Sequence, residues 1–446
     1  MNNSRRKFIK NIATTTSIIS LGGVAYGFSA KSYSRIIGAS DRILVGVMGT
    51  NGRGRGMARN FATRENTEVI YICDIDDNAI TKGINAVKSV TNSVPKAEKD
   101  IRNVLNDKDV DAMLLAPPDH WHAPATVMSC AAGKHVYVEK PLSHNPHEGE
   151  LAIEAARKFN RVVQMGSQRR SWDVLTQGIS ELKNGAIGRV YMAKTWYTNN
   201  RKSIGIGNVT NVPSNLDYEL WQGPAPRRPY KDNLIHYNWH WFWHWGTGEA
   251  LNNGTHEIDV ARWGLGVDYP TKVASVGGRY HFKDDWETPD TQIITFECKE
   301  GASIVWEGRS CNGTLVEGED RGVIFYGENG SMRTGGNSFS IFDLNGNLVK
   351  ETKSDIVIDG RNTSSPSAVL DNVHIDNFLN CIRKGGIPNA DVEIGHKSTL
   401  WVQLGNISQR VNRSLAIDQK NGHILNDNNA MKLWGRDYEP GWEPKV

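Results

Sequence analysis

Short apolar runs recur through the first third of the chain, and each ends in a polar turn that carries glycine or proline. Segments compatible with helices follow some of these turns, at 57–61, 124–132 and 148–159. Repeated strand, turn and helix units predict a doubly wound parallel sheet, with ligands beyond the carboxyl ends of its strands. The apolar runs are residues 43–48, 68–73, 110–116, 135–138 and 161–165. We therefore predict an α/β domain over residues 40–165.

The pattern changes after residue 165 from continuous apolar runs to alternation of apolar and polar positions. Such alternation is typical of antiparallel strands with one covered face. It occurs at residues 188–197, 271–280, 291–296, 302–306 and 321–326. We expect residues 166–446 to form a second domain of the α+β class.

The N-terminus has the anatomy of an export signal. A basic cluster, Arg5 to Lys10, precedes an apolar run of small residues that contains no acidic residue. The segment Ser4-Arg5-Arg6-Lys7-Phe8 resembles the twin-arginine signal, so we expect residues 1–30 to be a signal peptide and the protein to be exported, for instance to the periplasm. The alternative, a membrane anchor, needs a longer apolar run of about 20 residues.

Composition and charge narrow the possible partners. Hydrophobic and charged residues make up 39% and 23% of the chain, which is ordinary for a globular protein and argues against an integral membrane protein. Without residues 1–30, 48 basic residues face 49 acidic ones, and basic runs that would indicate nucleic-acid binding are missing. Five cysteines without a C-x-x-C pair indicate neither a disulfide framework nor a zinc site. We expect a small uncharged ligand.

A glycine-rich turn follows the first apolar run. Its residues Gly49, Asn51, Gly52, Arg53 and Gly54 precede a predicted helix, so backbone N–H groups and a helix N-terminus can approach a pyrophosphate. The match to G-x-G-x-x-G is imperfect, because Asn51 stands at the second glycine. By itself the turn is weak evidence, but its position between strand and helix predicts a Rossmann dinucleotide site.

Asp74 ends the second apolar run, 25 residues after Gly49. An acid at this spacing binds the ribose hydroxyls of the adenosine moiety, and its charge repels a 2′-phosphate, which favours NAD over NADP. The alternative is that Asp74 caps the helix that follows.

The third and fourth runs also end in polar residues. The third leads into Pro117-Pro118-Asp119-His120-Trp121-His122 and the fourth into Glu139-Lys140-Pro141. Together with the glycine-rich turn and Asp74, these segments resemble the Gfo/Idh/MocA oxidoreductases, the group of glucose-fructose oxidoreductase and inositol dehydrogenase. The resemblance covers most of the chain beyond the signal.

The resemblance implies a Rossmann domain followed by a domain with an open, mainly antiparallel sheet that binds substrate and forms a homo-oligomer, a dimer or tetramer. A C-terminal helix at about 391–410 would pack back between the domains. Pro117, His122, Glu139 and Lys140 would contact the cofactor, and Trp121 and Lys140 the substrate.

The segment 236–245 contains four tryptophans and three histidines. Aromatic faces beside hydrogen-bonding groups suit sugars, so we predict that Trp241 and Trp243 contact the substrate, although tryptophans are also ordinary core residues. His236, His240 and His244 stand four residues apart, as metal ligands on a helix can. No carboxylate or cysteine stands at ligand spacing, so we predict no metal site.

Residues 254–263 resemble the family helix that carries its catalytic histidine, here His256, and a downstream aspartate, here Asp259. In inositol dehydrogenases an aspartate precedes the histidine by one helical turn, and here that position is Asn252. This replacement puts a two-residue proton relay in doubt. We expect His256 to be catalytic, and Asn252, Asp259 and His256 to contact the substrate.

These residues predict an NAD-dependent dehydrogenase that removes a hydride from a secondary hydroxyl of a sugar or glycoside. Lys140 would stabilise the developing alkoxide while His256 accepts the proton, or Lys140 would itself be the base. Export implies that the nucleotide stays tightly bound.

Two other functions remain open at this point. One is a redox-neutral glycosidase that oxidises, eliminates, hydrates and reduces on a retained NAD. The other is a non-catalytic sensor of sugar or nucleotide, suggested by Asn51 and Asn252.

Overall fold

The structure is a computed structural model that describes residues 42–299, 301–335, 337–355 and 368–446. The predicted signal peptide lies outside these residues. In the part of the chain described, no helix combines the length and apolar character that a membrane span requires.

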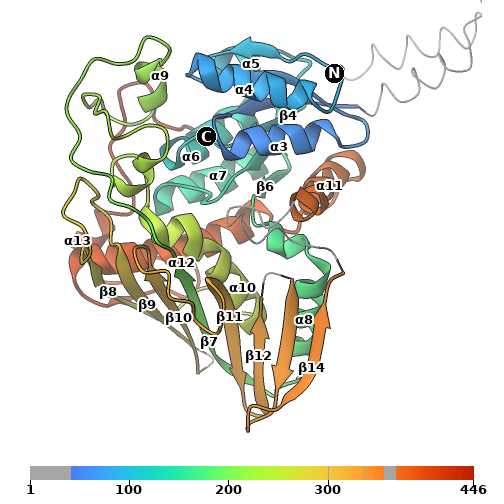
Figure 1. Cartoon of the computed structure of the whole chain (residues 1–446), viewed down its shortest axis with the longest axis vertical. Coiled ribbons are helices and arrows are strands. Elements are labelled where there is room, and N and C mark those ends of the chain that lie inside the picture. The colour runs from blue at the N-terminus through green and yellow to red at the C-terminus, as the bar shows by residue number, and fades with distance from the viewer. Residues whose placement is uncertain (1–41, 300, 336, 356–367) are drawn as a thin grey trace, which may run out of the picture. The chain divides into compact units, whose positions relative to one another are not determined.

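A parallel sheet of six strands forms the first layer, in the order β3-β2-β1-β4-β5-β6. Figure 1 shows its helices on both faces. The strands are buried on both sides, as in Val45, Val47 and Leu114, which explains why they read as continuous apolar runs. The strands are β1 (Ile43–Met48), β2 (Thr67–Cys73), β3 (Lys96–Glu98), β4 (Ala112–Leu115), β5 (His135–Val138) and β6 (Val163–Met165). The helices are α3 (Arg53–Ala62), α4 (Asp77–Lys88), α5 (Ile101–Asn106), α6 (Asp119–Ala131) and α7 (Pro146–Lys158). The predicted Rossmann fold is confirmed.

Helix α6 begins five residues before the predicted start at Pro124, so that boundary was wrong. Inside a helix, a proline leaves the carbonyl four residues earlier without its N–H partner. Here that carbonyl belongs to His120, and it accepts a hydrogen bond from Arg436 Nη2 at 2.7 Å. The C-terminal tail thus satisfies the group that Pro124 leaves free.

A nine-stranded mixed sheet forms the second layer, in the order β14-β13-β12-β11-β7-β10-β9-β8-β15. Its pairs are antiparallel except for the parallel pair β7 and β10, and β9 shows the alternating burial that the sequence predicts. The strands are β7 (Val190–Thr198), β8 (Lys272–Gly278), β9 (Thr291–Cys298), β10 (Ala302–Arg309), β11 (Arg321–Gly327), β12 (Gly330–Thr334), β13 (Ser338–Phe342), β14 (Leu348–Lys353) and β15 (Leu415–Ala416). The predicted second fold class is confirmed as well.

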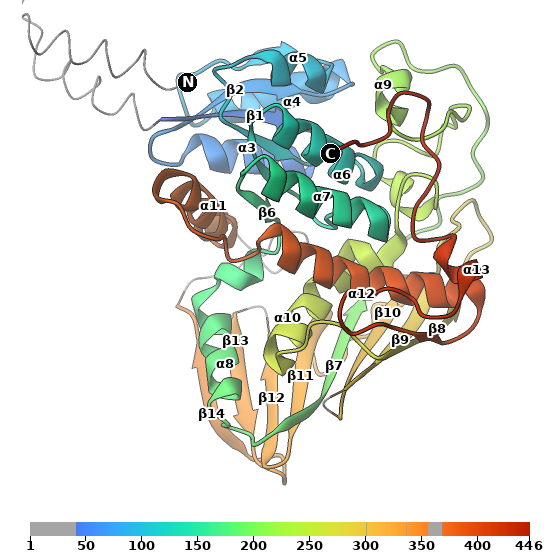
Figure 2. The same ribbon diagram turned by 180° about the vertical axis from the view of Figure 1, so that it is seen from behind.

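Helices connect the two layers. Helices α8 (Asp173–Lys183), α10 (Thr255–Leu265) and α12 (Val392–Val411) contribute to the apolar core on one face of the mixed sheet. Figure 2 shows α12 running between α7 and the strand end at β8, both of which it contacts. Helix α12 is the C-terminal helix expected near 391–410.

Helix α11 (Ala368–Lys384) packs on the parallel sheet although it follows the strands of the mixed sheet in sequence. Phe378 lies edge-on to Phe61 and Tyr137, with ring centroids 6.3 Å and 5.9 Å apart. The sequence analysis assigned all of residues 166–446 to the second domain, whereas the structure places this helix in the first layer. Local pattern cannot reveal which sheet an amphipathic helix joins.

Residues 199–245 form a long connection between β7 and α10, called here the 199–245 segment. It contains the short helix α9 (Tyr218–Gln222) and a 3-10 turn, Asn238–Trp241. Its apolar side chains form a separate cluster with Leu216, Trp221, Trp239 and Trp245. The segment therefore has its own small core.

Candidate active site

A cavity of about 680 Å³ opens at the carboxyl ends of β1, β2, β4 and β5. This is the expected ligand position in a doubly wound sheet. The predicted site residues that line it are Gly49, Asn51, Gly52, Arg53, Asp74, Pro117, Trp121, His122, Glu139, Lys140 and Asn252. The 199–245 segment adds Leu220, Trp221, His236, Tyr237, Trp239 and His240. The structure thus joins both layers of the molecule in one cavity.

The glycine-rich turn owes its shape to close backbone packing. Gly49 has φ +83°, and a Cβ there would lie 2.5 Å from the Ala116 carbonyl oxygen. A Cβ at Gly54 would lie 1.8 Å from the Gly49 oxygen, so Gly54 packs against the turn and does not line the cavity. At Gly52 a Cβ would meet nothing within 4 Å, and no side chain caps the start of α3. The first N–H groups of α3 are therefore available to an anion.

Asp74 lies at the opposite end of the cavity floor. It is buried, and one carboxylate oxygen accepts a hydrogen bond from the Thr50 backbone N–H at 2.6 Å. Burial raises the pKa of Asp74, and the Thr50 and Asp76 backbone hydrogen bonds oppose that shift. The helix-cap alternative is wrong for Asp74, because Asp76 caps α4 through the Asn78 N–H at 2.8 Å.

These features fit a nicotinamide dinucleotide. A free helix N-terminus suits the pyrophosphate, and an acid at the end of β2 suits the ribose hydroxyls. When bound, NAD supplies the hydride acceptor for oxidation of an alcohol. The volume lies within the usual range of ligand pockets, about 300–1,000 Å³.

Lys140 follows β5 and reaches across to the second layer. Its Nζ donates to the Asn252 backbone carbonyl at 2.5 Å and to the Asn252 side-chain oxygen at 3.1 Å. The carbonyl belongs to a π-helical turn, Ala250–Gly254, that precedes α10. Burial lowers the pKa of Lys140, although the nearby Glu139 and Asp119 carboxylates oppose this. A buried lysine of lowered basicity beside a nucleotide site can exchange a proton with a hydroxyl.

Arg53 and Glu139 form an ion pair in the cavity wall. Arg53 Nε donates to Glu139 at 2.9 Å, and its two terminal nitrogens bind Asp371 of α11 at 2.8 Å and 2.7 Å. Sequence reasoning missed Asp371, because it lies 318 residues from Arg53 and belongs to no motif. This network ties α11 to the glycine-rich turn.

His122 lies between two strand ends. Its Nδ1 lies 2.5 Å from the Pro141 carbonyl oxygen and its Nε2 lies 2.9 Å from the Pro117 carbonyl oxygen. Burial lowers the pKa of His122, and the Asp119 charge opposes this. Both ring nitrogens thus face the peptide groups that flank Lys140.

His256 and Asp259 lie deeper than expected and do not line the cavity. His256 begins α10 and is buried; burial and then the Lys140 charge hold its pKa well below the usual range. Asp259 accepts from Arg170 Nε at 2.8 Å and from Ser398 Oγ at 2.5 Å. Its carboxylate stabilises a buried ion pair, and the expected substrate contact is wrong for this structure.

Trp241 and Trp243 do not line the cavity either. Trp241 stacks on Trp286 with ring centroids 3.9 Å apart, and Trp243 faces the Arg410 guanidinium at 5.0 Å. The 3-10 turn points Trp239 and His240 into the cavity instead. The sequence located the aromatic segment, but an irregular backbone gives no period from which to choose its inward side chains.

Two family models match the chain. Residues 43–167 match "Oxidoreductase family, NAD-binding Rossmann fold", and residues 201–417 match "Oxidoreductase family, C-terminal alpha/beta domain".

Curated relatives and solved structures match parts of the chain or its fold. A glycosyl hydrolase family 109 protein of Shewanella pealeana is 28% identical over 136 residues, which is 29% of each chain. The inositol 2-dehydrogenase of Salmonella typhimurium is 27% identical over 270 residues, which is 59% of this chain and 66% of that one. The chain thus spans less than two thirds of either relative. A levoglucosan dehydrogenase with NADH and levoglucosan has the same fold, with a TM-score of 0.65 and 15% identity, covering 85% of this chain and all of that one.

Proposed function

Because the chain belongs to the Gfo/Idh/MocA oxidoreductase family, we propose that it oxidises a secondary hydroxyl of a sugar or glycoside with NAD. The observation that carries the proposal is Lys140, which lines the same cavity as the open N-terminus of α3 and Asp74. One cavity thus offers a nucleotide site and a proton-transferring amine. An inositol dehydrogenase among the relatives supports the polyol class.

In the proposed reaction the substrate C–H bond gives its hydride to the nicotinamide ring, its O–H proton goes to neutral Lys140, and a ketone forms. Asn252 holds Lys140 Nζ with two hydrogen bonds, which leaves the amine a direction toward the cavity. His256 stays neutral beside it, because burial and the Lys140 charge both oppose its protonation. The charges Asp74 and Asp76 disfavour a 2′-phosphate, so the proposed cofactor is NAD.

The proposal includes export with the nucleotide already bound. It rests on the resemblance of Ser4-Arg5-Arg6-Lys7-Phe8 to a twin-arginine signal. Fractionation of cells that make the chain with Arg5 and Arg6 changed to lysine tests this step. Export of that variant at the unaltered rate would contradict it.

The function is tested on purified, undialysed protein, by mass and absorbance analysis for nucleotide and then by incubation with glycosides and inositols. We expect bound NAD whose reduced absorbance band appears with one of the sugars. Sugar release without net reduction would instead indicate the redox-neutral glycosidase, which the match to a glycosyl hydrolase family 109 protein supports. A protein that takes up no nucleotide from added NAD would refute both.

A further inference from the structure

The three evenly spaced histidines of the 199–245 segment have three different surroundings. His236 Nε2 lies 2.7 Å from the Asp76 carboxylate, and His244 Nε2 lies 2.7 Å from the Pro226 carbonyl oxygen. His240 lines the cavity, as do Lys140 and Asn252. Among the described residues no cluster of three metal-binding side chains occurs. The spacing therefore needs another explanation, and His240 is the member that faces a ligand.

The tautomer of His240 follows from its contacts. Nδ1 lies 2.6 Å from the Tyr237 carbonyl oxygen, and a carbonyl only accepts, so Nδ1 carries the proton. In the neutral ring Nε2 is then a hydrogen-bond acceptor. Burial holds the pKa of His240 well below the usual range, and the Lys140 charge acts in the same direction. At neutral pH the ring is a fixed acceptor and a poor base.

The position of the His240 ring is fixed by packing. It stacks on Trp239 with ring centroids 3.6 Å apart and an interplanar angle of 19°. Trp239 donates its indole N–H to the His236 carbonyl at 2.9 Å. The acceptor therefore occupies one place and needs little ordering when a ligand binds.

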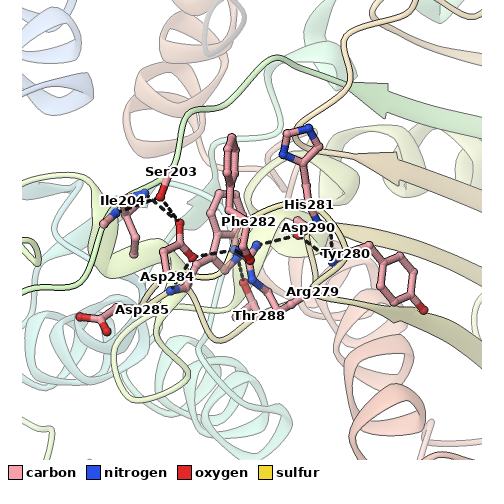
Figure 3. A network of polar contacts seen from close by, with 12 residues as sticks. Ser203, Ile204, Arg279, Tyr280, His281, Phe282, Asp284, Asp285, Thr288 and Asp290 are labelled. Atoms are coloured by element: carbon pink, nitrogen blue, oxygen red, sulfur yellow. Dashed lines mark hydrogen bonds and ion pairs between the residues drawn. The ribbon is translucent and has the colours of Figure 1, made fainter.

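Buried carboxylates anchor the 199–245 segment at its base, as Figure 3 shows. Asp284 accepts from Ser203 Oγ at 2.7 Å and from the Ile204 N–H at 3.0 Å. Arg279 donates to the same carboxylate at 2.7 Å and also pairs with Asp290 at 2.9 Å.

The middle of the segment is attached to the first layer. The Asp217 N–H donates to the Ile75 carbonyl at 2.9 Å, and Trp121 Nε1 donates to the Trp221 carbonyl at 2.9 Å. Anchored at these points, the segment is a built wall of the cavity.

We propose that His240 selects the substrate by accepting, at Nε2, a hydrogen bond from a second hydroxyl of the sugar. This inference rests on the proposed function and adds to it the chemical requirement for ligands, a ring with a free hydroxyl away from the one that Lys140 deprotonates. Trp239 and Trp221 supply apolar surface to the C–H faces of such a ring. A site that pairs a substrate hydroxyl rejects analogues that lack it.

The test compares His240→Leu with His240→Gln in NAD-loaded protein. Both variants lose the imidazole stack, but glutamine keeps an acceptor oxygen near the position of Nε2. Calorimetric titration with myo-inositol and methyl β-D-glucopyranoside measures Kd without requiring turnover. For the sugar that binds, we expect His240→Leu to raise Kd about tenfold, from the loss of one hydrogen bond to a buried acceptor, and His240→Gln to recover part of the loss.

His244→Leu is the matched control, because His244 belongs to the same run but does not line the cavity. Its Kd should equal that of the unaltered protein. Unaltered binding by His240→Leu, or failure of the unaltered protein to bind either sugar, would overturn the inference. Reduction of bound NAD in the same samples tests the proposed function separately, since sugar can bind without being oxidised.

Discussion

An amide meets the Lys140 amine where inositol dehydrogenases carry a carboxylate. Both hydrogen bonds from Nζ end on neutral oxygens of Asn252. The charged form of a buried lysine is costly unless a negative group contacts it. The amide therefore holds Lys140 in place without stabilising its ammonium form, which suits a base.

Asn252→Asp tests this interpretation. The new carboxylate would contact Nζ and raise the pKa of Lys140, so the rise of kcat/KM with pH should move to higher pH by about one unit or more. The pH–rate profile measures the shift. Asn253→Asp is the control, since Asn253 donates to Glu249 and accepts from Arg321. An Asn252→Asp profile that does not move would exclude Lys140 as the titrating base.

At the scale of elements, α11 is held to the Rossmann layer by apolar packing and by one bidentate ion pair. Arg53 and Asp371 are largely buried, with side-chain exposures of 21% and 3%. A pair in this position contributes geometry as well as charge, because the guanidinium fork fixes the helix relative to the glycine-rich turn. A helix from the far end of the sequence thus supports the nucleotide site.

Asp371→Asn should lower the free energy of unfolding by about 3 kcal/mol, because it leaves Arg53 partly unpaired in a buried position. Urea denaturation of the nucleotide-free protein measures this loss. Asp376→Asn on the same helix breaks the more exposed pair with Arg64, where Asp376 is 49% exposed, and should cost less than about 1 kcal/mol. Equal losses in the two variants would mean that α11 is held by packing alone.

At the scale of the whole molecule, the 199–245 segment joins the two layers above the adenosine end of the cavity. Asp76 is the point of attachment, since its carboxylate accepts from Asn215 Nδ2 at 2.8 Å and lies 2.7 Å from His236 Nε2. Leu216 forms a β-bridge with Asp76. A nucleotide held below this attachment leaves only after the segment moves.

Asn215→Ala should therefore speed the release of bound NAD about fivefold, since one net hydrogen bond of about 1 kcal/mol is lost from the closed form. Release is followed by the nucleotide that appears in solution after rapid dilution. The exposed neighbour Asn211, changed to alanine, is the control and should not alter the rate. A rate that Asn215→Ala leaves unchanged would show that the segment does not limit release.

Local patterns predicted the parts of the site that belong to strand ends. Gly49, Asp74 and Lys140 each follow a buried strand directly, so the parallel sheet alone carries them to one edge. Trp241, Trp243 and Asp259 failed as predictions for another reason. Each was chosen for its residue type on an element whose inward face depends on what packs against it.

The sequence by itself determined the Rossmann layer, the mixed second sheet and the nucleotide end of the cavity, because alternation, glycine turns and strand-end residues act over a few neighbouring positions. Only the tertiary structure decided that Asp371 supports Arg53, that Asn252 holds Lys140 and that His240 faces the ligand. These contacts join residues far apart in the chain, on elements whose orientation is set by packing, and packing is a property of the assembled core.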